Sequence, residues 1–256
     1  MHRPRKRFGQ HFLHDRNVIE RILSAVDPQP GEHLLEIGPG QGALTYPLLQ
    51  HCRRLIAIEL DRDLVPILEQ QAKQFGQLEI VNADILKFEL GSIAQDKKFR
   101  LVGNLPYNIS TPLMFHLLES AQWIEDMHFM VQKEVAQRIV AGCDDASYGR
   151  LSVMLQYRCQ CRYLFDVAPG SFSPPPRVDS AVIRLIPRPA PAVDVGDYAN
   201  FSQIVQSAFS QRRKTISNSL KLILDRETII ACGVDPGLRA ERLEISDFAK
   251  LSRALS

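Results

Sequence analysis

Apolar, strand-like runs alternate with amphipathic, helix-like segments along the first half of the chain, and this pattern limits the possible folds more than any other feature. The strand-like runs lie at 33–37, 55–59, 78–81, 99–102 and 127–131. The helix-like segments lie at 43–51, 63–75 and 133–140. Strands that alternate with helices build a mostly parallel sheet with helices packed on its faces. The sequence therefore predicts an α/β protein with a doubly wound, Rossmann-like sheet.

The segments at either end of this pattern complete the predicted domain. Asp15 is placed to cap a helix whose apolar face runs from Val18 to Val26. The strand-like runs at 162–167 and 180–186 are joined without a long helix, which favours an antiparallel pair at the edge of the sheet.

A change of pattern near residue 190 indicates a second domain. Prolines at 187, 189 and 191 predict a stiff linker. Beyond it only helices are expected, at 198–211, 215–224, 228–232 and 247–255. We therefore expect a first domain at 1–190, which begins with a basic segment at 1–14, and a small all-α domain at 191–256.

The composition is that of an ordinary soluble protein. Of the 256 residues, 45% are hydrophobic and 23% are charged. No apolar run reaches the length of a membrane span, and the basic N-terminus lacks the apolar stretch of a signal peptide, so we expect a cytoplasmic protein without membrane contact. The five scattered cysteines argue against a disulfide framework. Cys159 and Cys161 fit alternation on a strand better than a zinc site, and no metal is expected.

A glycine-rich segment at 36–42 follows the first strand-like run and opens a helix. Gly38 and Gly40 allow the backbone to turn tightly and a ligand to approach closely. Dinucleotide-binding folds use a similar loop, so the glycines alone do not choose the ligand. Glu36 inside the strand and the G-x-G-x-G spacing favour S-adenosylmethionine.

Acidic residues recur at the ends of the next strands. Glu59 ends the run 55–59, where it can accept hydrogen bonds from both ribose hydroxyls, and Asp84 follows 78–81, where it can accept from an adenine amine. Either residue alone also fits a surface acid at a strand terminus. Ligands of such sheets bind beyond the carboxyl ends of the strands, so the acids and the glycine loop together predict a cofactor site.

The segment 104–107 ends the fourth of these strands and indicates the chemistry. The amide oxygen of Asn104 and the carbonyl of Leu105, which is held by Pro106, suit the NH2 group of a flat nitrogen nucleophile. The ring of Tyr107 can stack on the base. The lone pair of adenine N6 is delocalised, and such hydrogen bonds favour a more tetrahedral nitrogen. Positioning then supplies most of the acceleration, and the segment predicts methylation of an amine.

Other residues suit a nucleic-acid substrate. A target base must leave its stack, and Phe172, ahead of three prolines, can stack on its second face or be an ordinary core residue. The net charge is only +2, but basic residues cluster near both ends of the chain. The clusters are Arg5, Lys6 and Arg7, and Arg212, Arg213 and Lys214. Each alone also fits a solvated surface; with the base-handling segment they become candidate phosphate contacts.

With these motifs the chain resembles the KsgA-type ribosomal RNA small-subunit adenine N6,N6-dimethyltransferases over almost its whole length. The resemblance rests on the segments 6–13, 36–42, 58–61, 103–110, 129–135, 148–152, 172–179 and 211–215. It implies a class I methyltransferase sheet with a helical C-terminal domain, and S-adenosyl-L-methionine as methyl donor with S-adenosylhomocysteine as product.

The resemblance also implies the substrate and the cofactor contacts. The substrate would be the small-subunit (16S) rRNA of an immature small ribosomal subunit, late in ribosome biogenesis, with no stable protein partner. Two adjacent adenines in a hairpin loop near its 3′ end would each be methylated twice at N6. The implied cofactor contacts are His11, Leu13, Gly38, Glu59, Asp84 and Asn104. The family usually has Asn in place of His11, whose imidazole can still make one hydrogen bond.

Other functions remain open at this point. Large-subunit rRNA adenine methyltransferases share much of the framework but resemble the segments 172–179 and 211–215 less well. DNA-adenine and protein-glutamine methyltransferases typically have proline in place of Leu105. A non-catalytic ribosome assembly factor is a third reading, against which the intact Glu36, Glu59, Asp84 and Asn104 argue.

Overall fold

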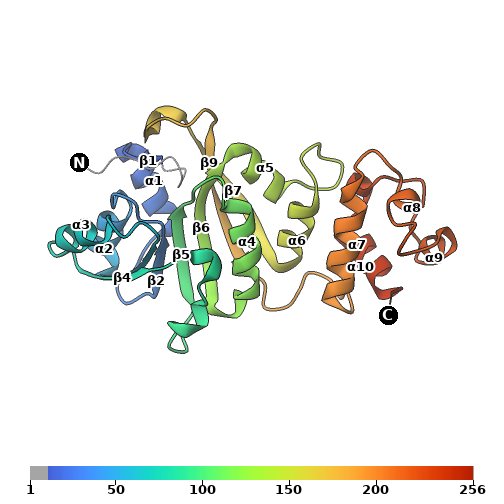
Figure 1. Cartoon of the computed structure of the whole chain (residues 1–256), viewed down its shortest axis with the longest axis horizontal. Helices are drawn as coiled ribbons and strands as arrows, with labels where there is room; N and C mark the ends of the chain where they lie inside the picture. Colours follow the sequence, from blue (N-terminus) through green and yellow to red (C-terminus); the bar gives the residue numbers. More distant parts are fainter. Residues whose placement is uncertain (1–10, 256) are drawn as a thin grey trace. The chain divides into compact units, whose positions relative to one another are not determined.

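A seven-stranded mixed sheet forms the centre of the fold in a computed structural model that describes residues 11–255. Its strand order is β4-β3-β2-β5-β6-β9-β7 (Figure 1). The strands are β2 (Leu34–Ile37), β3 (Arg54–Glu59), β4 (Gln77–Asn82), β5 (Phe99–Asn104), β6 (Ile124–Gln132), β7 (Cys159–Val167) and β9 (Ser180–Pro187). The pairs from β4 to β6 are parallel, and β9 is antiparallel to β6. This confirms the predicted α/β sheet.

The order of the strands determines where a ligand can bind. From β2 the chain proceeds outward to β3 and β4, and it then returns to β5 on the other side of β2. The chain therefore leaves the carboxyl ends of the neighbouring strands β2 and β5 in opposite directions. Such a topological switch point is the usual ligand crevice of open α/β sheets.

Helices precede or connect the strands up to β7. They are α1 (Arg16–Val26), α2 (Thr45–Cys52), α3 (Val65–Ala72), α4 (Ser110–Glu119), α5 (Lys133–Val140) and α6 (Arg150–Arg158). The carboxylate of Asp15 caps α1 by accepting from the amides of Asn17 and Val18, as predicted. Helix α4 has no counterpart among the predicted helices.

Short 3-10 turns connect several of these elements. They are η2 (Ile85–Lys87), η3 (Leu90–Ser92), η4 (Ala121–Trp123), η5 (Pro169–Ser171) and η6 (Ala240–Arg242). The turn η2 matters for the site, because it places Asp84 directly beyond the carboxyl end of β4.

A second, two-stranded sheet joins segments that are far apart in the sequence. Strand β1 (Phe12–Leu13) pairs antiparallel with β8 (Phe172–Ser173), with Leu13 opposite Phe172. Both of these side chains are buried, in a core cluster that also contains Val18 and Ile22 of α1. The hydroxyl of Ser171 donates to the Asp15 carboxylate at 2.9 Å and ties the start of α1 to the same region.

Charged residues form a buried network at the amino ends of β5 and β6, away from the ligand crevice. The guanidinium of Arg100 donates to Asp126 at 3.0 Å and to Glu32 at 2.8 Å, and Arg184 donates to Asp126 at 2.7 Å. Burial alone raises the pKa of Asp126, but these hydrogen bonds hold it below its usual value. His128, 1% exposed, lies beside them, and burial lowers its pKa to about 4.

The chain falls into two compact units. The first contains the residues up to Ala136 together with Cys161–Pro187, and the second contains Gln137–Gln160 and the chain from Arg188 onward. The second unit has the helices α7 (Tyr198–Ser210), α8 (Ile216–Ser219), α9 (Arg226–Ala231) and α10 (Ile245–Arg253). Residues 137–160 thus group with the helical unit, while a functional domain division at residue 190 stays a prediction.

The second unit has its own core, built on α7. Phe201 and Ile204 of this helix are fully buried, as is Phe248 of α10. The expected helix at 215–224 is much shorter, because α8 ends at Ser219 and turns follow it. Among residues 11–255, no helix has the length and apolar character needed to span a bilayer.

Candidate functional site

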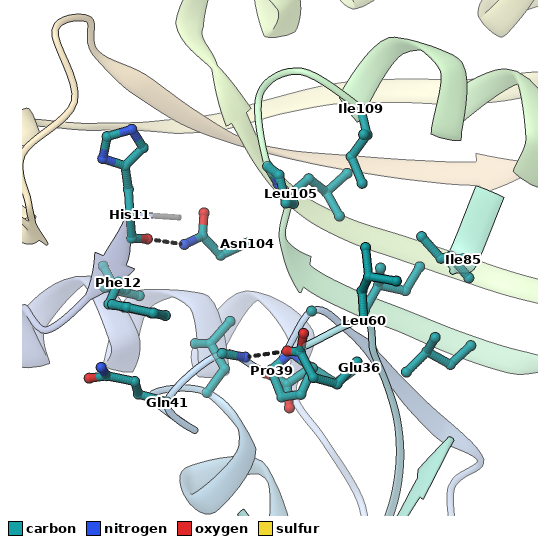
Figure 2. Close-up of a pocket in the computed structure, with 18 of the residues that line it drawn as sticks. His11, Phe12, Glu36, Pro39, Gln41, Leu60, Ile85, Asn104, Leu105 and Ile109 are labelled. Atoms are coloured by element: carbon teal, nitrogen blue, oxygen red, sulfur yellow. Dashed lines mark hydrogen bonds between the residues drawn. The ribbon is translucent and has the colours of Figure 1, made fainter. Parts of the chain in front are cut away.

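A pocket of about 360 Å³ lies at the carboxyl ends of β2, β3, β4 and β5, where the switch point predicts it. Its walls come from β1, the glycine loop after β2, the end of β3, the turn at Asp84, and the segment 104–109. Figure 2 shows side chains from these segments around one space, with His11 and Asn104 on one side and Leu60 and Ile85 on the other.

The glycine loop has a backbone conformation that side chains disfavour. Gly40 has a φ of 56°, and a Cβ there would lie 3.2 Å from the ring of Phe12. Gly42 has a φ of 86°, and its Cβ would lie 2.3 Å from the ring of Tyr46. Glycine at both positions lets the loop turn while β1 and α2 pack closely against it.

Glu59 connects the end of β3 to the glycine loop. Its carboxylate accepts from the amide of Gly40 at 3.1 Å and from the amide of Asp61 at 2.7 Å. Burial raises the pKa of this carboxyl, whereas the two amide bonds act in the opposite direction. An ionised carboxylate has about four acceptor sites, so lone pairs remain for a vicinal diol in the pocket.

Glu36 is a second buried acid of the pocket wall. It is 2% exposed, and its carboxyl accepts a hydrogen bond of 2.6 Å from the hydroxyl of Thr45 at the start of α2. Burial raises its pKa to about 8, against the effect of Thr45 and with the help of nearby Glu59. Such a group is largely neutral at pH 7 in the free protein, and a cationic ligand favours its ionised form.

Asp84 lines the pocket just beyond the carboxyl end of β4. Its Oδ1 accepts from the amide of Leu86 at 3.1 Å and caps η2. The apolar side chains beside it were not predicted: Ile85 is buried, whereas Leu60 is 52% exposed although it is large and apolar. Leu60 and Ile85 both line the pocket (Figure 2) and give it apolar surface, which suits a flat ring. Acidic residues at strand ends allowed pocket residues to be predicted from the sequence, whereas single apolar residues outside the strands give no such signal.

The segment 104–107 begins at Asn104, the last residue of β5. The side-chain amide of Asn104 donates from Nδ2 to the backbone carbonyl of His11 at 2.9 Å (Figure 2). The amide of Leu105 donates to the carbonyl of Met130 at 3.1 Å, and Leu105 is 1% exposed. The turn is therefore fixed to the neighbouring strand β6, and Pro106 continues along the pocket wall.

Tyr107 is held on two sides. Its hydroxyl and that of Ser180 lie 2.6 Å apart in a hydrogen bond. Its ring stacks on the imidazole of His11, with 5.5 Å between the centroids and 27° between the planes. Burial raises the pKa of the tyrosine hydroxyl, which therefore remains protonated near neutral pH.

Phe172 differs from the expectation that it stacks on a base. The side chain is 3% exposed and packs in the core cluster with Leu13, and it is not among the residues that line the pocket. Its strand pairs with β1, which directs the ring into the core. In this arrangement Phe172 supports the pocket wall and does not face the ligand space.

The predicted basic residues have different surroundings. Arg5, Lys6 and Arg7 lie outside the described residues. Arg212 donates to the carboxylate of Glu241 at 3.4 Å and to the carbonyl of Ala146, so it braces a loop of the second unit. Arg213 and Lys214 are exposed, as is Arg212. Over residues 11–255, no group of three or more His, Cys, Asp or Glu side chains is arranged to hold a metal ion.

Curated relatives match the whole chain. The ribosomal RNA small subunit methyltransferase A of Methylococcus capsulatus is 53% identical over 255 residues, which cover 100% of this chain and 99% of the relative. The protein of the same name from Xanthomonas campestris pv. campestris (strain B100) is 52% identical over 248 residues, 97% of this chain and 95% of the relative.

Solved structures show the same fold. A dimethyladenosine transferase from Plasmodium falciparum superposes with a TM-score of 0.78 at 26% identity, covering 94% of this chain and 96% of that one. The 23S rRNA methyltransferase ErmE superposes with a TM-score of 0.74 at 29% identity, covering 95% and 99%. The predicted class I methyltransferase fold is confirmed.

A family model described as ribosomal RNA adenine dimethylase matches residues 1–256, from the basic N-terminus through the helical unit. With this match, the full-length relatives and a pocket at the switch point of a methyltransferase sheet, the chain belongs to the ribosomal RNA adenine dimethylase family.

Proposed function

We propose that this enzyme methylates N6 of two adjacent adenines, twice each, in a hairpin loop near the 3′ end of small-subunit rRNA, with S-adenosylmethionine as donor. One observation carries the proposal: the NH2 group of Asn104 is bonded to His11, which leaves the amide oxygen for an incoming amine beside the ring of Tyr107. Membership of the family supports adenine in ribosomal RNA, and the relatives' names support the small subunit.

The residues of the pocket fit S-adenosylmethionine. The lone pairs left on Glu59 suit the ribose diol, Asp84 suits the adenine amine, and Leu60 and Ile85 suit the faces of the adenine ring. Glu36, a buried acid beside the glycine loop, suits a cationic ligand. His11, Leu13, Gly38 and Gly40 also line the pocket, and of these we assign cofactor contacts to Leu13, Gly38 and Gly40. When bound, the cofactor supplies an electrophilic methyl group.

The chain's own residues position the amine. The amide oxygen of Asn104 and the carbonyl of Leu105 accept the two N6 hydrogens, so that the nitrogen lone pair points away from both. Tyr107 stacks on the adenine ring and restricts its rotation. A bound donor would supply its methyl group to the N6 lone pair held in this way, its sulfur–methyl bond would break to leave S-adenosylhomocysteine, and the proton that N6 loses would pass to solvent. Orientation supplies most of the acceleration, as in other reactions between well-aligned partners.

The substrate is a polymer, and we assign its phosphates to exposed cations. Arg212, Arg213 and Lys214 are all exposed, but the Arg212 side chain bonds Glu241 and the Ala146 carbonyl, so Arg213 and Lys214 are the candidates in the second unit. Arg5, Lys6 and Arg7 are the candidates at the N-terminus. RNA loops are recognised by shape, splayed bases and backbone contacts. Immature small subunits in the cytoplasm carry such a loop together with the surrounding phosphates, and they are the proposed substrate particle.

The test is a product analysis. The protein is incubated with isotope-labelled S-adenosylmethionine and immature small subunits from a methylation-deficient strain, and the digested RNA is analysed by mass spectrometry. We expect N6,N6-dimethyladenosine at two neighbouring positions. Its absence, under conditions in which a known relative makes it, would refute the proposal.

The same experiment separates the alternatives. Naked large-subunit RNA is assayed in parallel, because ErmE, which is named as a 23S rRNA methyltransferase, shares the fold over 95% of this chain. Methylation of that RNA alone would assign the enzyme to the large subunit. Calorimetry without detectable S-adenosylmethionine binding would support an assembly factor without catalysis.

A further inference from the structure

The side-chain amide of Asn104 can be placed in two ways that differ by half a turn. The oxygen and the NH2 group have almost the same size, so packing does not distinguish the two orientations. Only one orientation can accept a hydrogen bond from an amine. In the other, two NH2 groups face each other and no hydrogen bond forms.

The backbone carbonyl of His11 decides between these orientations. A carbonyl oxygen can only accept, so it bonds the NH2 group of Asn104, at 2.9 Å, and repels the amide oxygen. Figure 2 shows this bond, with the amide oxygen of Asn104 not directed at the His11 carbonyl. The carbonyl thus selects which end of the amide remains for the substrate.

The side chain of His11 fixes the position of that carbonyl. Its Nδ1 lies 2.8 Å from the backbone carbonyl oxygen of Pro174, which requires the proton to be on Nδ1. Its ring stacks on Tyr107 at 5.5 Å. One residue therefore contacts the three segments that surround the amine position: the Asn104 side chain, the Tyr107 ring and the loop after β8.

Strand β1 needs this support. Its ladder with β8 has only two residue pairs, Phe12 with Ser173 and Leu13 with Phe172. Isolated two-stranded ladders are marginally stable, so the pairing alone does not hold the backbone at His11 to a fraction of an ångström. The two side-chain contacts of His11 lie at the end of this ladder and restrain it.

We propose that His11 is a positioning residue, which orients the amide of Asn104 for the amine and holds the ring of Tyr107. The inference rests on the proposed amine methylation and adds a role that differs from direct cofactor binding. The two roles predict different kinetics. Loss of a cofactor contact raises the Kd for S-adenosylmethionine, whereas loss of amide orientation lowers kcat and leaves that Kd nearly unchanged.

Three substitutions separate the contacts of the side chain. His11→Asn keeps a donor for Pro174 and loses the ring, His11→Phe keeps the ring and loses the donor, and His11→Ala loses both. The matched control is His14→Ala, because His14 is an exposed histidine of the same segment that does not line the pocket. Thermal melts verify that each variant is folded.

We expect kcat on immature small subunits to fall in His11→Ala by about ten- to a hundredfold, as when a reacting group is misplaced by about 1 Å. The kcat values of His11→Asn and His11→Phe should lie between those of His11→Ala and the unaltered protein. The Kd for S-adenosylmethionine, measured by calorimetry, should change by less than about threefold, which is under about 0.7 kcal/mol of binding free energy. An unchanged kcat, or a raised Kd with unchanged kcat, would overturn the positioning role.

A second readout does not depend on turnover. The side-chain NH2 resonances of Asn104 are assigned by their loss in Asn104→Ala. They should shift in His11→Ala and stay in place in His14→Ala, because the bond to the His11 carbonyl is weakened only in the former. If the unaltered protein methylates no RNA, the proposed function fails, while this spectrum still decides whether His11 orients Asn104. Unshifted resonances in His11→Ala would refute that orientation.

Discussion

The carboxylate of Glu59 accepts a hydrogen bond from the backbone amide of Gly40, with 3.1 Å between the amide nitrogen and Oε2. Since its other oxygen accepts from the amide of Asp61 at 2.7 Å, the last residue of β3 holds the glycine loop that follows β2. The amide of Gly38 also donates to the carbonyl of Ile58 at 2.9 Å, which joins the same two segments a second time.

Glu59→Gln should weaken the cofactor site. The amide of glutamine has one acceptor end, so its NH2 group must face one of the two N–H donors and leave it unpaired. An unsatisfied buried donor costs about 1–3 kcal/mol of stability, and the same energy lost from binding would raise the Kd by about 5- to 150-fold. We expect a higher Kd for S-adenosylmethionine by calorimetry and a lower Tm. Unchanged values of both would contradict the role assigned to Glu59.

Asn104→Ala should abolish turnover and leave cofactor binding mostly intact. The substitution removes the acceptor for the amine but none of the acids that suit the cofactor. The measurement is single-turnover methylation of immature small subunits beside calorimetry with S-adenosylmethionine. Asn17→Ala, at an exposed position on α1, is the control for asparagine loss. Turnover that stays at the unaltered rate would refute the amine-positioning role of Asn104.

Tyr107 should separate into a ring function and a hydroxyl function. Tyr107→Phe loses the bond to Ser180, at a cost of about 1 kcal/mol in stability, and keeps the stacking ring. We expect turnover within a few-fold of normal for Tyr107→Phe and a severe loss for Tyr107→Ala. A double-mutant cycle with Ser180→Ala isolates the pair energy by thermal or chemical unfolding. Equal turnover for the Phe and Ala variants would exclude a stacking role.

The basic residues of the second unit should fall into two groups. Arg213→Glu and Lys214→Glu reverse exposed charges, so binding to immature small subunits should weaken and depend less steeply on salt. Arg212→Ala should instead lower the Tm, because this side chain bonds Glu241 and the carbonyl of Ala146. Filter binding at several salt concentrations and thermal melts measure the two effects. The reverse pattern would place Arg212 among the RNA contacts.

The stability of the free protein should fall as the pH rises toward 8. The pKa of Glu36 is about 8 in the folded protein and ordinarily 4.5, so the folded state binds the extra proton between these values. Its contribution is complete below pH 4.5 and is lost as the pH passes 8. The effect of His128 on stability has the opposite pH dependence, because its pKa of about 4 lies below the usual 6.5. Its contribution to the free energy of unfolding is lost as the pH falls from 6.5 to 4.

The two effects separate above pH 6.5, where only Glu36 of this pair still titrates. We expect the free energy of unfolding to decrease between pH 6.5 and 8 in the unaltered protein and to decrease less in Glu36→Gln. Glu69→Gln, on the exposed face of α3, is the control. Urea titrations at several pH values provide the measurement, and parallel pH profiles for Glu36→Gln and the unaltered protein would contradict the assignment.

Most strands of the sheet could be predicted from the sequence, because strand periodicity and acidic residues at strand ends are local signals. The predicted runs at 55–59 and 180–186 correspond to β3 and β9 within a residue. The pocket residues Glu59, Asp84 and Asn104 came from the same logic, since parallel strands bring their carboxyl ends together.

The missing parts depend on contacts between distant segments. Nothing local in Phe12 and Leu13 indicates a strand, because their partners are residues 172–173. For the same reason the sequence could not decide whether Phe172 faces a base or the core. His128 lies in an apolar run, and its neighbours Arg100 and Arg184 belong to other strands. Such pairings follow from the three-dimensional arrangement and not from the spacing of residues.

The pairing of β1 with β8 has a consequence for the order in which the protein is made. His11 and its partner Pro174 are 163 positions apart. The pocket wall that contains β1 is therefore synthesised first, but its partner strand β8 is synthesised only after about two thirds of the chain. Domains generally fold as units during synthesis. We therefore expect nascent chains that end before β8 to lack a finished cofactor pocket, so that methyl-donor binding begins only near the completion of translation.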